Sequence, residues 1–224
     1  MTGPVLVVAA HPDDEVLGCG GTMAKWASEG RAVHVLLMAD GETARETATT
    51  DGCAARMAAT EDACATLRCA SLLRHSLADN RLDGMDLLDV VRLIEERVAA
   101  FRPTTILTHH AGDVNVDHRV VHQAVTVACR PQPGHSVREL LFFEVPSSTE
   151  WQTPGSAPAF LPNYFVDISE HTGAKVDALG CYRSEMRDFP HPRSFRAIGA
   201  RDQWRGATAG YQAAEAFMVG RMLA

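Results

Sequence analysis

Residues 5–21 read VLVVAAHPDDEVLGCGG, and this stretch decides the fold. Its first six residues are apolar and rich in valine, as in a buried strand, whereas glycines and a helical pattern follow the polar centre. The order strand, polar loop and helix is the first unit of an α/β fold with a parallel sheet. Ligands of such sheets bind outside the carboxyl ends of the strands, which is where residues 11–15 lie.

The alternation of strands and helices continues along the rest of the chain. We expect further strands at residues 32–38, 104–108, 140–145 and 163–168. We expect a helix through residues 23–26 and further helices at residues 54–67, 87–101, 120–128, 175–182 and 210–222. Residues 146–162 are rich in Ser, Thr and Pro, and a loop of this length is typical of a functional loop or lid. With 224 residues, no internal repeat and no convincing linker, residues 1–224 are predicted to form a single domain. The predicted class is a Rossmann-like three-layer α/β/α fold with a mainly parallel sheet.

Composition excludes several classes of protein. Hydrophobic residues make up 46% of the chain and charged residues 22%, which is typical of a buried core and argues against disorder and fibres. The formal net charge of −7 gives no positive field to attract nucleic acid. No apolar run approaches the roughly 20 residues that span a bilayer, and residues 1–10 lack a secretion signal, so we expect a cytoplasmic protein. The six cysteines form no CxxC pair and are expected to be reduced, mostly buried thiols.

Two clusters of polar residues follow predicted parallel strands. The first is His11-Pro12-Asp13-Asp14-Glu15, and the second is HHAGDVNVDH at residues 109–118. Because the carboxyl ends of parallel strands meet at one edge of the sheet, both clusters can contribute to one site. A catalytic zinc site uses about three His and Asp or Glu ligands and leaves one position open. One His and one carboxylate of the first cluster and one His of the second satisfy that count, and His118 with His122 at helical spacing is an alternative pair.

Residues 18–21, Gly-Cys-Gly-Gly, follow the first cluster at the expected start of a helix. Their spacing matches neither GxGxxG nor a Walker loop, and no lysine follows at the expected place. We therefore interpret these glycines as a means of close packing between helix and strand, and not as a phosphate cradle.

The two clusters together resemble the PIG-L/LmbE family of metal-dependent N-deacetylases. Residues 112–118, 144–151 and 190–194 are similar to a bacterial branch of that family. Family members remove acetyl groups from N-acetylglucosamine-type sugars in glycolipids, thiol cofactors, polysaccharides and glycosylated natural products. The resemblance implies an enzyme that hydrolyses an N-acetyl group on a small-molecule sugar or sugar conjugate.

Carried over residue by residue, the resemblance makes His11, Asp14 and His118 the zinc ligands and leaves Asp13 unligated as general base. Physically this is sensible, because zinc acidifies bound water and a neighbouring carboxylate can accept the proton and pass it to the leaving amine. Asp117 is expected to orient a ligand or a neighbouring donor.

One departure concerns the group that stabilises the oxyanion. Several family members have a histidine three residues before the second ligand histidine, where this chain has Asn115. An amide donates a hydrogen bond but is no cationic acid. Asn115, His191 or a backbone N–H therefore remain the candidates.

Four arginines could hold sugar hydroxyls or a phosphate through their planar donors: Arg45, Arg56, Arg193 and Arg205. Of these, Arg193 is the expected substrate-binding residue. Zinc is the expected metal, although Fe²⁺, cobalt or manganese also suit two imidazoles and a carboxylate. Alternative functions are a metal-dependent amidase or esterase on a non-sugar acyl substrate and a non-catalytic, metal-stabilised sugar-binding protein. The oligomeric state is open, and a homo-oligomer is compatible with the sequence.

Overall fold

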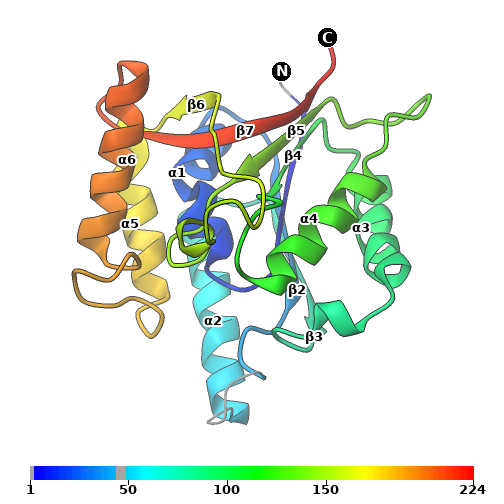
Figure 1. Ribbon diagram of the computed structural model, residues 1–224, viewed down its shortest axis with the longest axis horizontal. Helices are drawn as coiled ribbons and strands as arrows, with labels where there is room; N and C mark the ends of the chain where they lie inside the picture. The colour runs from blue at the N-terminus through cyan, green and yellow to red at the C-terminus, as the bar shows by residue number, and fades with distance from the viewer. Residues whose placement is uncertain (1–2, 44–48) are drawn as a thin grey trace.

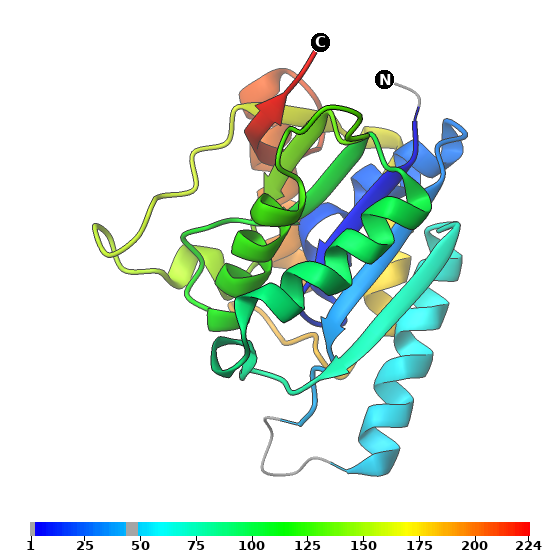
Figure 2. The same cartoon turned by 90° about the vertical axis from the view of Figure 1, so that its right-hand side faces the viewer.

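One seven-stranded sheet between two helical layers forms the protein (Figures 1 and 2). The computed structural model describes residues 3–43 and 49–224. The strands are β1 (Val5–Ala9), β2 (Val33–Ala39), β3 (Ser71–Leu77), β4 (Thr105–His109), β5 (Glu139–Phe143), β6 (Tyr164–Asp167) and β7 (Ala214–Met222). The helices are α1 (Asp14–Ser28), α2 (Thr50–Thr66), α3 (Leu87–Phe101), α4 (Val116–Ala128), α5 (Thr172–Cys181) and α6 (Phe195–Ala209). Three 3₁₀ turns are η1 (Leu82–Gly84), η2 (Thr149–Trp151) and η3 (Ser169–His171).

The sheet has the order β3-β2-β1-β4-β5-β7-β6. Strands β1 to β5 pair in parallel, whereas β7 runs antiparallel to both of its neighbours, β5 and β6. The predicted α/β fold with a mainly parallel sheet is therefore confirmed.

Strand β1 shows why a continuous apolar run belongs in the middle of such a sheet. Val5, Val7 and Ala9 pack into the core on the side of α1, α2 and α5. Leu6 and Val8 pack into the core on the side of α3 and α4. Figure 1 shows these two layers, with α1, α2, α5 and α6 on one side of the sheet and α3 and α4 on the other. Both faces of the strand are covered, so every residue of it is apolar and buried.

The strand order reverses between β1 and β4, which are neighbours in the sheet. The chain leaves β1 for helix α1 on one face and leaves β4 for helix α4 on the other. Such a switch point opens a crevice at the carboxyl ends of the two strands, where ligands of open α/β sheets bind. Both polar clusters of the sequence lie at this crevice.

The glycines at the start of α1 allow close packing, as expected from the sequence. A Cβ atom at Gly18 would lie 2.4 Å from the Phe143 ring, and one at Gly21 would lie 2.8 Å from Ile168 Cδ1. Helix α1 therefore approaches the strands more closely than larger residues would permit.

The structure of the C-terminal part of the chain differs from the sequence prediction. The helix predicted at residues 210–222 is wrong, because residues Ala214–Met222 form strand β7 between β5 and β6. Good helix formers there are overridden by strand pairing on both sides. Strand β3 and helix α6 are absent from the sequence prediction. Helix α6 buries only Ile198, Asp202 and Gly206, so it has no apolar stripe to reveal it.

In the described ranges, no helix is both long enough and apolar enough to cross a bilayer. All six cysteines are free thiols. Three of them are buried and three are partly exposed, so the expectation that most are buried is not met.

Candidate metal centre and active site

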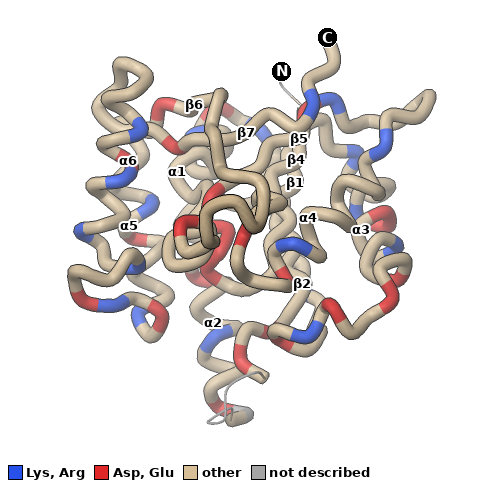
Figure 3. Tube along the Cα trace, viewed as in Figure 1, with Lys and Arg blue, Asp and Glu red and all other residues tan. Residues whose placement is uncertain are grey.

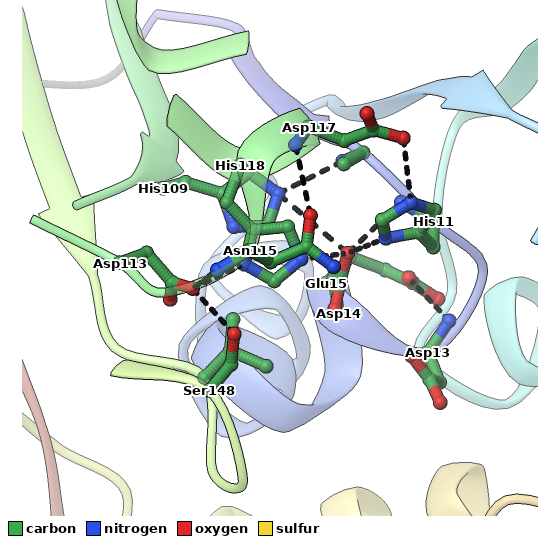
Figure 4. A network of polar contacts seen from close by, with 12 residues as sticks. His11, Asp13, Asp14, Glu15, His109, Asp113, Asn115, Asp117, His118 and Ser148 are labelled. Atoms are coloured by element: carbon green, nitrogen blue, oxygen red, sulfur yellow. Dashed lines mark hydrogen bonds and ion pairs between the residues drawn. The ribbon is translucent and has the colours of Figure 1, made fainter. Parts of the chain in front are cut away.

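Two strand ends bring His11, Asp14 and His118 together. His11 follows β1, Asp14 begins α1, and His118 lies in the first turn of α4. His11 Nδ1 and His118 Nε2 each lie 3.2 Å from Asp14 Oδ2. All three side chains are buried, and their ligand atoms lie within 4.8 Å of one another. Figure 4 shows the two imidazoles converging on the Asp14 carboxylate.

The outer nitrogen of each imidazole faces a buried carboxylate. His11 Nε2 lies 3.0 Å from Asp117 Oδ2 and 3.0 Å from Asp79 Oδ1. His118 Nδ1 lies 3.2 Å from Asp113 Oδ1. Metal-binding histidines characteristically give their second ring nitrogen to a carboxylate, which fixes the tautomer and the orientation of the ring.

The carboxyl groups dominate the electrostatics of this cluster. Burial lowers the pKa of His118, but Asp14 and Asp113 outweigh it and raise that pKa to about 9. Burial likewise opposes the charged form of His11, yet hydrogen bonds to Asp117 and Asp14 raise its pKa well above the usual value. Burial would raise the pKa of Asp14, but His118 and His11 hold it well below its ordinary range. The buried carboxylates therefore favour positive charge on the two imidazoles. Figure 3 shows several Asp and Glu positions, in red, near the middle of the molecule.

The donor set suits a divalent metal such as zinc. Ligand atoms about 2.0–2.1 Å from a tetrahedral zinc ion lie about 3.3 Å apart, close to the observed separations of 3.2 Å. Asp14 Oδ1 is buried and has no hydrogen-bond partner in the described part of the chain. His109 stacks on His118, but its Nε2 accepts the Ala10 N–H at 2.8 Å and so has no free lone pair for a metal.

Asp13 points to different partners from those of Asp14. Its backbone has φ 102°, in the left-handed region, and its side chain makes no capping bond to α1 although it occupies the N-cap position. Asp13 Oδ2 accepts from Arg193 Nη1 at 2.8 Å and lies 3.7 Å from Arg56 Nη2. Burial raises the pKa of the Asp13 carboxyl to about 6 against the opposing effect of Arg193 and Arg56. Asp13 is thus a buried carboxylate next to Asp14 in the chain that pairs with arginines and is not part of the triad.

A cavity of about 320 Å³ opens onto this centre. Its lining is polar: His11, Asp13, Gly41, Arg56, Asp79, Asn80, Asn115, Glu185 and Arg193. Asn115 caps α4, because its Oδ1 accepts the Asp117 N–H at 2.8 Å. Its Nδ2 donates to Asn80 Oδ1 at 3.1 Å. Both ends of the amide are therefore fixed, and a second N–H of Nδ2 remains for a ligand.

Two predicted residues have partners that differ from those expected. Arg193 lines the cavity, but it binds Asp13 rather than standing free for a substrate. His191 is not among the lining residues; its Nδ1 accepts the Arg193 N–H at 3.0 Å and its ring meets Trp151 edge-on. The alternative ligand His122 does not join the triad, because its Nδ1 bonds to the His109 carbonyl at 2.9 Å.

The other candidate arginines divide into three cases. Arg56 is buried beside Asp13, and its Nη2 donates to the Pro12 carbonyl at 2.8 Å. Arg205 forms a bidentate pair with Glu144, at 2.9 and 2.8 Å. Arg45 lies outside the described residues.

Sequence reasoning missed three groups that support the centre: Asp79, Asp113 and Glu185. Asp113 belongs to the second cluster, but nothing in its spacing showed that it faces His118. Asp79 follows strand β3, so predicting that strand would have placed it at the same sheet edge. Glu185, which forms an ion pair with Arg56, follows α5 and has no local signal.

Comparisons with known proteins agree with this geometry. Residues 6–129 match the family described as PIG-L, GlcNAc-PI de-N-acetylase. The chain is 30% identical to the uncharacterized deacetylase YaiS of Escherichia coli K12, over 80% of this chain and 90% of that protein. It is 25% identical to a 1D-myo-inositol 2-acetamido-2-deoxy-alpha-D-glucopyranoside deacetylase of Mycobacteroides abscessus, over 83% of this chain and 82% of that protein. The crystal structure of the conserved protein TT1542 from Thermus thermophilus superposes with a TM-score of 0.78 and 25% identity, covering 98% of this chain and 95% of that one. With the buried triad and the matched sequence on the same residues, the chain belongs to the PIG-L/LmbE family of deacetylases.

Proposed function

We propose that this protein is a zinc-dependent hydrolase that removes the acetyl group from the nitrogen of an N-acetylglucosamine-type sugar or sugar conjugate. The observation that carries the proposal is the buried triad of His11, Asp14 and His118 beside the unligated carboxylate of Asp13. A purely structural metal site closes all four positions with protein ligands, whereas three ligands and an adjacent base suit hydrolysis.

The residues of the triad would hold the metal, and Asp13 would move the proton. A divalent cation, when bound, lowers the pKa of water towards about 7 and polarises an amide carbonyl. Asp13 would accept a proton from the attacking water and deliver it to the departing amine nitrogen, and its burial, which raises the pKa of the carboxyl, favours uptake of that proton. Arg193 holds the Asp13 carboxylate in place through a 2.8 Å hydrogen bond.

Asn115 is the proposed donor to the developing oxyanion. Its amide is oriented by the Asp117 N–H and by Asn80, and it lines the cavity together with His11. Preorganised donors of this kind contribute about 10²–10³ in rate. Asn115 cannot supply a proton, so proton delivery to the amine falls to Asp13.

The polar cavity supports a hydroxyl-rich substrate. Charged and amide side chains from separate segments of the chain line it, including Arg56, Asp79 and Glu185. Such groups donate to and accept from sugar hydroxyls. The relative from Mycobacteroides abscessus, a deacetylase of an acetamido sugar, supports the same class of substrate.

The test is the release of acetate by purified protein from N-acetylglucosamine derivatives and from N-acetylated amino acids and simple amides. We expect release from the sugars, loss of release after chelation and recovery on adding zinc. Release that survives complete removal of the metal would contradict the zinc mechanism. Metal-dependent release from the non-sugar amides alone would contradict the substrate class and favour a general amidase.

A further inference from the structure

We infer that the short turn formed by residues 147–149 positions both parts of the reaction centre, the metal ligand His118 and the base Asp13. This inference rests on the proposed function. The turn follows β5 in the chain and lies at the start of the Ser/Thr/Pro-rich loop of residues 146–162. Its three hydroxyl groups face two separate networks, one behind each part of the centre.

Two hydroxyls of the turn hold the carboxylate behind His118. Ser148 Oγ donates to Asp113 Oδ1, and Thr149 Oγ1 donates to Asp113 Oδ2 at 2.7 Å. The Asn115 N–H adds a third bond to Asp113, at 2.9 Å. Asp113 is fully buried, so these bonds replace its water and fix the direction of its oxygens towards His118 Nδ1. Figure 4 shows Ser148 and Asp113 on the side of His118 away from His11.

The third hydroxyl acts on the base through Arg193. Ser147 Oγ accepts from Arg193 Nε at 2.8 Å, and Arg193 Nη1 donates to Asp13 Oδ2 at 2.8 Å. The guanidinium is planar and rigid, so its Nε and Nη1 bonds have a fixed relative geometry. The position of Ser147 therefore helps to set the position of the Arg193 nitrogen that binds Asp13.

The two residues that bind Arg193, Ser147 and Asp13, both have strained backbone conformations. Ser147 has φ 66° and Asp13 has φ 102°, and neither is glycine. Such conformations persist only where surrounding interactions enforce them, and they gather at functional sites. Arg193 connects these two strained residues.

The turn is held by bonds that do not involve the Ser147 and Ser148 hydroxyls. Glu150 accepts the Ser147 N–H at 2.6 Å and the Ser148 N–H at 3.3 Å. The Thr149 N–H donates to the Val145 carbonyl at 2.9 Å, and Thr149 Oγ1 accepts the Val145 N–H at 2.8 Å. Removing a serine hydroxyl therefore leaves the backbone of the turn in place.

The experiment separates the two networks by measuring metal affinity and turnover independently. Metal affinity is measured by competition with a chromophoric chelator, without substrate. We expect Ser148→Ala to weaken zinc binding by about 10-fold, because one of the three bonds that fix Asp113 is lost. Thr149→Val, which also removes the acceptor of the Val145 N–H, should weaken zinc binding at least as much. Thr149→Ser keeps the hydroxyl and should restore parental affinity. Ser147→Ala should leave zinc affinity unchanged and lower kcat by about 10-fold with little change in KM.

Thr153→Val is the matched control, because its hydroxyl lies on the same loop but bonds to Ser156 and, among the described residues, to neither Asp113 nor Arg193. We expect it to match the parent in both measurements. Equal zinc affinity in the parent, Ser148→Ala and Thr149→Val would overturn the inference, as would equal losses in Thr153→Val. A parent protein that binds no metal at all would instead refute the proposed function, and the inference with it.

Discussion

Replacing Asp13 by Asn should abolish turnover and leave the metal in place. Asn has nearly the same size, tolerates the left-handed backbone found at this residue, and can still accept the hydrogen bond from Arg193. The substitution therefore removes only the negative charge and the proton acceptor. Any large change in rate then reports on proton transfer and not on packing.

The size of the effect follows from the position of the side chain. General acid–base catalysis contributes about 10²–10⁴ in rate, which is about 2.7–5.4 kcal/mol of activation free energy. Asp13 lies outside the triad, so zinc affinity should change by less than about 10-fold. Arg56 keeps its ion pair with Glu185 and its bond to the Pro12 carbonyl, so the fold should persist.

The assay compares kcat, KM and zinc content per chain in the parent and in Asp13→Asn. Asp62→Asn, an exposed carboxylate on α2, is the control and should behave as the parent. A kcat within a few-fold of the parent, with full zinc content, would refute the assignment of Asp13 as base. Loss of zinc together with activity would show that Asp13 is a ligand.

The triad and the buried ion pairs lead to three further predictions. His118→Ala should lose zinc and activity together, and parental zinc content in this variant would contradict the triad. His122→Ala should keep its zinc content, because the His122 side chain bonds to the His109 carbonyl and packs on Phe142, away from the triad. Zinc at about 100 times its dissociation constant should stabilise the folded protein by about 2.7 kcal/mol. Calorimetry should then show a Tm about 5–10 °C higher than that of the chelated protein, and an unchanged Tm would mean that zinc does not bind the folded state. Lys175→Met should lower the free energy of unfolding, measured by urea denaturation, by about 3–5 kcal/mol. The buried Nζ lies 2.8 Å from Asp202 and 2.7 Å from Glu215, so the substitution leaves these two buried carboxylates without their cation. The pair of Lys25 and Glu29 at the surface, in which Lys25 is half-exposed and Glu29 exposed, supplies the control. Lys25→Met should cost less than about 1 kcal/mol, and equal losses in the two variants would contradict the role of burial.

Elements with a strong apolar pattern could be predicted from the sequence. Strand β1 is a continuous apolar run because both of its faces are covered, and its predicted bounds agree with the structure within one residue. Helix α3 has its predicted bounds, since Val90, Ile94 and Val98 form one buried stripe at helical spacing. The residues of the triad also come together as expected, because parallel strands deliver their carboxyl ends to one edge.

Elements held by polar contacts could not be predicted in this way. Helix α6 is attached through Arg205 to Glu144 and through Arg201 to the Leu17 carbonyl, and neither contact leaves a pattern in the local sequence. Strand β3 lies at the edge of the sheet and is only partly buried, so its apolar signal is weak. Because strand β3 was not predicted, Asp79, which follows it, was not placed at the site either. The contact between Arg193 and Asp13 joins residues 180 positions apart, so it has no signal in the local sequence.

The two adjacent aspartates show how one backbone conformation separates two chemical roles. An aspartate just before a helix usually caps it by accepting an N–H of the first turn. Asp13 occupies the N-cap position, but its left-handed φ of 102° directs the carboxylate to Arg193, so it makes no capping bond. Asp14 follows with helical geometry and faces both imidazoles. A helix N-terminus already favours negative charge, so it can hold a ligand and a base side by side without a capping side chain. The strained conformation of Asp13 directs its carboxylate into the cavity beside the triad, and this is the structural feature that best supports the proposed catalytic role.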